Sequence, residues 1–160
     1  MSCKLIPVVS SVRNNDGGVL YVQGRYTEDV KQLERWAVYR LYGSRAKVFE
    51  VLGVSYLKLE RLEDADAAFT RSMQLDPNQP RATLELAQIR FIQLRHQEAR
   101  QLLFRHNKVS QPSARSLWLG VQLARIYTKS DDEASLALAL KNIFPTSKEY
   151  QLYKDSNRNL

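Results

Sequence analysis

The stretch 47–77 limits the possible folds of this chain more than any other, because it carries two apolar stripes at helical spacing. A short polar break at Glu60-Arg61 separates the stripes, and Pro77 follows the second. Neither helix can bury its stripe alone, so the pair requires similar units on both sides, as in a solenoid. The two stripes comprise Phe49, Leu52, Gly53 and Tyr56, and then Leu62, Ala65, Phe69, Ser72 and Leu75.

The same residues resemble a tetratricopeptide repeat, a helix pair of about 34 residues with large and small side chains at defined offsets. With Ala46 as the first position, the Leu-Gly pair, the tyrosine, the alanine, the phenylalanine and the proline all match. Gly53 and Ala65 are small, so the two helix backbones can approach each other closely. This resemblance implies an all-α fold, a right-handed superhelix of about four helix pairs with a short C-terminal capping helix.

Copies of the unit can be placed along the whole chain. We expect an irregular lead-in at 1–9, a repeat domain at 10–155 and a frayed tail at 156–160. Leu119-Gly120 repeats the Leu-Gly pair, whereas the third repeat has Leu86-Ala87 there. The repeats are predicted at 10–45, 46–79, 80–112 and 113–145, with the cap at 146–155.

The first repeat departs from the pattern at two acidic residues. Asp16 and Asp29 stand where leucine and alanine are usual, and an unpaired carboxylate at a helix contact is unfavourable. The second helix of this repeat is expected at about 27–41, opened by Thr27-Glu28-Asp29.

Composition favours a single domain with a solvated basic surface. The 160 residues carry a net charge of +7, with lysine and arginine spread along the chain among acidic residues. Nucleic-acid binding through the basic second helices is an alternative, which predicts affinity that falls steeply with salt. Cys3 is the single cysteine, so no internal disulfide forms, and no apolar run has the length of a membrane span. The N-terminus, interrupted by Pro7, does not resemble a secretory signal.

Residues suited to catalysis are sparse. His96 and His106 are not spaced i, i+4 and so form no helical metal pair, and Cys3 has no assignable histidine partner. The sequence contains no glycine-rich phosphate loop, and the Leu-Gly pairs are packing features. We therefore predict no enzymatic activity, no catalytic residue, no metal site and no cofactor.

A closer resemblance rests on five segments and on the order in which they follow one another along this chain. They are NNDGGVLYVQGRY, SRAKVFEVLG, LDPNQPRATLELA, ARSLWLGVQLARI and IFPTSKEYQ. Together they are similar to the type IV pilus biogenesis and stability family, called PilF or PilW. The resemblance covers about residues 12–152 and corresponds to the C-terminal part of the family.

That resemblance implies a non-enzymatic pilotin. Such proteins are lipoproteins at the periplasmic face of the outer membrane, and they bind the secretin subunit and promote its localisation and assembly. Since the first repeats and the lipidated cysteine of the family have no match here, membrane contact is expected only through an anchor absent from this chain. A generic peptide-binding adaptor is the alternative function. Homodimerisation through an open N-terminal end is a further expectation.

The expected binding surface is the groove lined by the first helices of the repeats. For each of its apolar residues, packing against a neighbouring helix is the alternative role. By resemblance to the repeat class, the partner-binding positions are Asn14, Tyr21, Val22, Lys47, Glu50, Val54, Leu57, Lys58, Arg81, Leu84, Gln88, Phe91, Ile92, Leu117, Val121 and Arg125.

Overall fold

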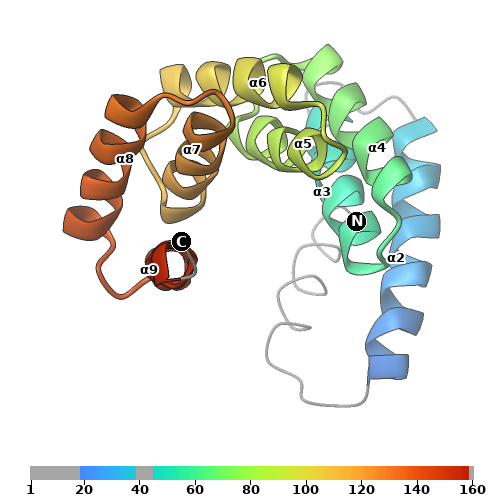
Figure 1. Cartoon of the computed structure of the whole chain (residues 1–160). Coiled ribbons are helices and arrows are strands. Elements are labelled where there is room, and N and C mark those ends of the chain that lie inside the picture. The colour runs from blue at the N-terminus through green and yellow to red at the C-terminus, as the bar shows by residue number, and fades with distance from the viewer. Residues whose placement is uncertain (1–18, 39–44, 159–160) are drawn as a thin grey trace. The chain divides into compact units, whose positions relative to one another are not determined.

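The computed structural model describes residues 19–38 and 45–158, and in these ranges every regular element is a helix (Figure 1). The prediction of an all-α fold with helices packed in pairs is therefore confirmed. The chain divides into two compact units, residues 1–71 and 72–160. The predicted lead-in at 1–9 and the residue Asp16 lie outside the described residues.

The first unit contains α2 (Val19–Val38), α3 (Arg45–Lys58) and the greater part of α4 (Leu62–Leu75). Helix α2 runs without a break through the point where we predicted a new helix to begin at Thr27, so that boundary was wrong. No proline interrupts this stretch, and the single Gly24 weakens a helix by only about 1 kcal/mol. Helix α2 packs against α3, and the Tyr56 hydroxyl donates a hydrogen bond to Glu34 Oε1.

Helices α3 and α4 meet where the sequence places its small residues. Ala65 and Phe69 of α4 are fully buried. A Cβ atom placed on Gly53 of α3 would lie 2.6 Å from Phe69 Cε1, well inside van der Waals contact. Gly53 therefore sets the distance at which α3 and α4 pack.

Asp29 on α2 is buried, and its Oδ2 has no hydrogen-bond partner among the described residues. Burial raises the pKa of this carboxyl above its ordinary value of 3.8, while the charge of Arg25 opposes that rise. Since folding favours the protonated acid, Asp29 destabilises the folded state as the pH rises through the raised pKa.

Asp29→Asn is accordingly expected to increase the free energy of unfolding at neutral pH, and this gain should disappear below pH 3.8. Urea unfolding followed by circular dichroism at several pH values measures it. Glu28→Gln changes the exposed acid next to Asp29 and should give a much smaller gain. A stability difference between Asp29→Asn and the parent chain that is independent of pH would contradict this assignment.

The second unit consists of two helix pairs and one further helix after the end of α4. The pairs are α5 (Pro80–Ile92) with α6 (His96–Val109), and α7 (Ala114–Ile126) with α8 (Ser130–Ile143). Helix α9 (Lys148–Arg158) packs against α7 and α8, and Figure 1 shows it nearly end-on beside them. It ends three residues beyond the predicted cap, so Ser156 and Asn157 are helical rather than part of a tail.

The turns inside the helix pairs repeat the same backbone geometry. Glu60, Leu94 and Thr128 adopt positive φ values of 58°, 61° and 53°. The next residue in each turn donates its N–H to a carbonyl of the preceding helix, as Arg61 does to Tyr56 and Arg95 to Arg90. This is the left-handed closure that commonly ends a helix, used here without glycine. The chain thus enters each second helix in the same way.

The core of the second unit is built mainly from the facing sides of α5, α6 and α7. It centres on buried leucines and alanines, and the Nδ1 atom of buried His106 lies 2.8 Å from the Pro80 carbonyl oxygen. Ser113 and Ser116 form a capping box that starts α7, with the Ser113 side chain accepting from the Ser116 N–H. Six residues make the buried cluster: Leu84, Ala87, Ala99, Leu103, Leu119 and Leu123.

Candidate peptide-binding surface

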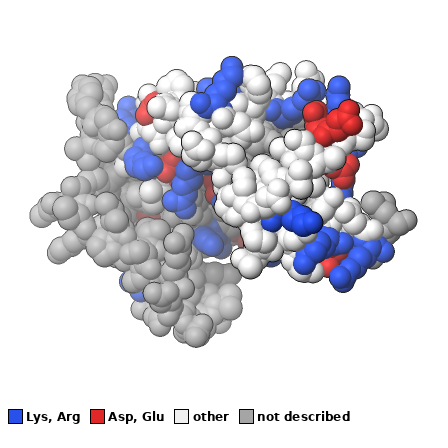
Figure 2. Space-filling view, turned by 90° about the vertical axis from the view of Figure 1, so that its left-hand side faces the viewer, with Lys and Arg blue, Asp and Glu red and all other residues white. Residues whose placement is uncertain are grey.

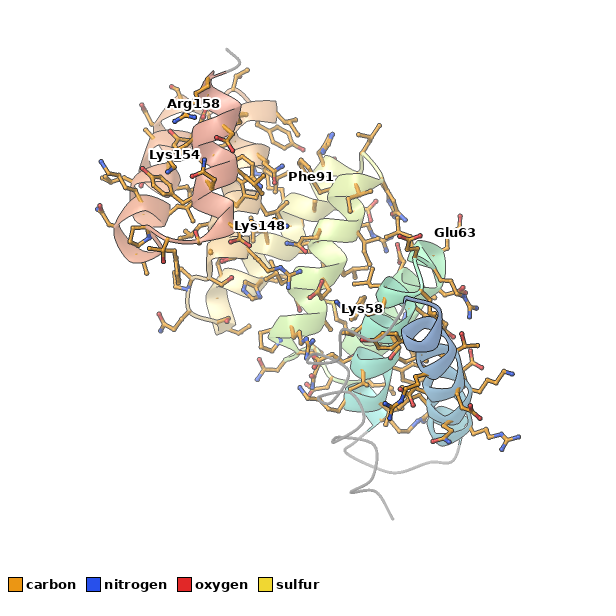
Figure 3. All side chains as sticks on the ribbon, turned by 90° about the horizontal axis from the view of Figure 1, so that it is seen from below. Lys58, Glu63, Phe91, Lys148, Lys154 and Arg158 are labelled. Atoms are coloured by element: carbon orange, nitrogen blue, oxygen red, sulfur yellow. The ribbon has the colours of Figure 1, made fainter. Side chains whose placement is uncertain are left out.

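The predicted surface residues of the first unit fall into three groups. Lys47 and Lys58 are exposed, and Figure 3 shows Lys58 at the end of α3. Val54 and Leu57 are half-buried. Glu50 is buried, and its Oε1 accepts a hydrogen bond from Lys47 Nζ at 2.8 Å. Asn14 and the side chains of Tyr21 and Val22 lie outside the described residues.

In the second unit, the predicted residues of α5 remain accessible in part. Arg81 is exposed, Gln88 and Phe91 are half-buried, and Ile92 has 64% of its surface exposed. Figure 3 shows Phe91 on this helix. The Phe91 ring also makes an edge contact with His96, with the ring centroids 5.3 Å apart. These residues combine apolar and polar groups on one helix.

Three other predicted residues of this unit have little accessible surface. Leu84 belongs to the buried cluster, and Leu117 and Val121 of α7 are buried. Helix α9 packs on α7, the helix that carries the last two residues. For Leu84, Leu117 and Val121, and for Glu50 in the first unit, packing inside the protein is therefore the observed role.

Arg125 joins the last three helices of the second unit. Its guanidinium donates from Nε to Glu133 Oε1 at 2.6 Å, and from Nη1 to Ser156 Oγ at 2.8 Å. A third bond, from Nη2, reaches Asn157 Oδ1 at 2.6 Å. The same group lies over the rings of Trp118 and Tyr153, which contact each other edge to face. Arg125 therefore holds α9 against α7, although its sequence position predicted a partner-binding role.

Sequence reasoning did not single out a polar cluster between α5 and α7. Arg115 donates to both carboxylate oxygens of the buried Glu85, at 2.8 Å each, and also to Gln88 Oε1. The hydrogen bonds to Glu85 raise the pKa of the Arg115 guanidinium. Opposite charges on the first helices of successive repeats were the signal available in the sequence. These bonds fix the position of Gln88 beside the other accessible residues of α5, Arg81, Phe91 and Ile92, which together are called the α5 surface.

The charged residues of α9 form a separate feature. Figure 3 shows Lys148 near one end of this helix and Arg158 near the other, with Lys154 between them. Lys154 Nζ lies 5.0 Å from the centroid of the Tyr150 ring, which stacks against Tyr153. No residue of α9 is buried, so polar contacts and ring contacts hold this helix in place.

In the described part of the chain, the residue types that usually bind metal ions do not gather into a site. Histidine, cysteine, aspartate and glutamate side chains form no group of three that could hold an ion there. Among the same residues, no helix is both long and apolar enough to cross a membrane.

The comparisons with known proteins agree with each other. The type IV pilus assembly protein PilF of Pseudomonas aeruginosa is 37% identical over 143 residues, which are 89% of this chain and 57% of PilF. A solved structure of Pseudomonas aeruginosa PilF superposes with a TM-score of 0.79 at 35% identity, over 86% of this chain and 62% of that chain. This chain thus spans little more than half the length of PilF. No family model matches it.

Two more distant structures show the fold alone. PilW, a type IV pilus biogenesis factor, has a TM-score of 0.67 at 21% identity, over 81% of this chain and 60% of its own. MamA has a TM-score of 0.68 at 15% identity, over 89% of this chain and 85% of its own. The similarity to PilF in both sequence and structure is what identifies the relationship. The chain belongs to the PilF/PilW family of type IV pilus assembly proteins, built from tetratricopeptide-type helix pairs.

Proposed function

We propose that this chain is a non-enzymatic protein-binding scaffold of type IV pilus biogenesis, which binds the secretin subunit and promotes its assembly in the outer membrane. The observation that carries the proposal is the 37% identity to PilF over 89% of the chain. The family relationship associates the chain with the bacterial envelope and with protein partners. Within the envelope, we place its action at the periplasmic face of the outer membrane.

The accessible part of α5 is the best-supported binding surface in the second unit. Ile92 and Phe91 supply apolar area, while Arg81 and the amide group of Gln88 supply hydrogen-bond donors. Such a mixture suits an extended or helical peptide, whose apolar side chains dock while its backbone and polar groups bond to the rim. In the first unit, Lys47 and Lys58 with half-buried Val54 and Leu57 offer a surface of similar composition.

Ile92→Ser is expected to weaken binding of the secretin subunit about tenfold, because a central apolar contact of an interface contributes roughly 1–2 kcal/mol. Phe91→Ala and Lys58→Glu should weaken it as well. Purified secretin subunit immobilised on a sensor surface, with the full chain in solution, measures the affinity.

Leu138→Ser is the matched control, since Leu138 of α8 is 57% exposed, close to the 64% of Ile92. Figure 2 looks onto the side of the molecule where α8 lies, and most side chains there are uncharged. The control substitution therefore removes a comparable apolar group from a helix other than α5. Equal losses for the two variants would argue against the α5 surface. Absence of binding by the parent chain would refute the proposed partner for this chain.

A further inference from the structure

A cleft opens between α6 and α8, with α7 as its floor. Its volume is about 550 Å³, in the range of sites that accept small molecules or a few side chains of a partner. Leu103, Leu123 and Leu136 provide apolar lining, and Gly120 deepens the floor because it has no side chain. The groove residues predicted from the sequence take no part in this α6–α8 cleft.

The rim of the cleft carries an exposed aromatic ring. Phe104 of α6 has 62% of its surface exposed, whereas Ala99 and Leu103 of the same helix are buried. Lys108 Nζ lies 4.4 Å from the centroid of this ring. A partner that covers Phe104 would also meet the ammonium group of Lys108.

Positive charge predominates around the cleft. Arg100 lies over the Tyr127 ring, with 5.0 Å between the guanidinium carbon and the ring centroid, and Lys129 lines the same end. Neither Arg100 nor Lys108 forms an ion pair with a carboxylate in the described part of the chain. Glu98, the one acid of α6, is already bound by Arg95 at 2.7 Å and Arg90 at 3.3 Å. Asp132 is the single acid among the lining residues.

We propose that the α6–α8 cleft is a second protein-docking site, which takes an acidic segment of a partner with one apolar side chain inserted against Phe104. The apolar floor accepts the inserted side chain, and the cations on the rim pair with the flanking carboxylates. Gln97, Gln101 and Asn107 add amide groups that can bond to the backbone of the segment. This site is independent of the α5 surface and of the identity of the partner bound there.

The shape of the α6–α8 cleft and the presence of Asp132 in its lining favour a peptide over a lipid bilayer as the occupant. An inserted side chain fills a cleft, whereas a flat anionic membrane leaves it empty and places its negative charge against Asp132. The charge pattern therefore favours a protein segment with acids on both sides of one apolar residue.

The test uses the full chain labelled with nitrogen-15 and a synthetic peptide that has one leucine between short runs of glutamate. Titration followed by NMR should shift the amide signals that line the cleft on α6, α7 and α8. Arg100→Gln is expected to weaken binding about fivefold, the factor of one lost ion pair at a partly covered site. Arg105→Gln removes the same charge from an exposed residue of α6 that does not line the cleft, and should change affinity less than about twofold.

Two further probes complete the test. A peptide with serine in place of the leucine should bind more weakly to the parent chain, and Phe104→Ser should remove that difference. Unchanged signals, shifts confined to other helices, or equal losses for Arg100→Gln and Arg105→Gln would each overturn the proposal. Binding to phosphatidylglycerol vesicles that depends on Arg100, without peptide binding, would overturn it too and assign the surface to a membrane.

Discussion

Gly53→Ala is expected to lower the free energy of unfolding by about 2 kcal/mol. Overpacking of a core contact destabilises by about 1–3 kcal/mol, and the better helix propensity of alanine returns about 1 kcal/mol. The high end of the first range applies because the new Cβ would lie 2.6–2.7 Å from three atoms of the Phe69 ring. That ring is fully buried, and close packing in protein interiors limits how far it can move. Urea unfolding followed by circular dichroism measures the change.

Gly120→Ala is the matched control, since both glycines follow leucine in the first helix of a pair. At Gly120 the nearest atom to a new Cβ is Leu136 Cδ1 at 3.0 Å, the end of a flexible side chain. The higher helix propensity of alanine should then roughly offset the unfavourable contact with Leu136, and the free energy of unfolding should change by less than about 0.5 kcal/mol. Similar effects at the two positions would show that Phe69 does not determine the spacing of α3 and α4.

Arg125→Ala is expected to release α9 from α7 while the two helix pairs of the second unit remain folded. The substitution removes the bonds to Glu133, Ser156 and Asn157 together with the ring contacts. Partly exposed charged hydrogen bonds contribute roughly 1 kcal/mol each at most, so α9 should lose about 1–2 kcal/mol of local stability. Hydrogen exchange measured by mass spectrometry should show faster exchange across 148–158, because no buried residue holds α9.

Arg158→Ala provides the comparison on α9 itself. Arg158 is exposed, and its nearest acid, Asp155, lies 3.9 Å away, so its removal should leave exchange of α9 unchanged. Slow exchange across α9 in the Arg125 variant would mean that the contact between Trp118 and Tyr153 suffices to hold this helix. Faster exchange in α5 and α6 as well would indicate a general loss of stability rather than release of α9.

The all-α class was predictable because its signals are local. Helical spacing of apolar residues identifies each helix, and a proline or polar break limits it. The small residues Gly53 and Ala65 also predicted that the backbones of α3 and α4 approach closely, whereas only the structure shows that Gly53 lies against the Phe69 ring. Helix α2 was the exception, since a lone glycine is too weak a signal to tell a turn from a continuous helix.

The candidate surface was only partly predictable. Position in a repeat identifies the face of a helix, but it does not reveal what packs on that face. Leu117 and Val121 occupy groove positions, yet they are buried in a helix on which α9 packs. The role of Arg125 depends on Ser156 and Asn157, more than thirty residues later in the chain. No short-range pattern encodes such a contact.

The sequence by itself determined the helix pairs, because apolar periodicity is a property of residues a few positions apart, and the five segments similar to the PilF/PilW family indicated the family. The tertiary structure alone decided which cations remain available to a partner. Arg115 and Arg125 are held in internal bonds, whereas Arg100 and Lys108 lie over rings at the rim of a cleft. The physical reason is that the availability of a charge depends on the groups within a few ångströms of it, and packing between helices brings those groups together from distant parts of the chain.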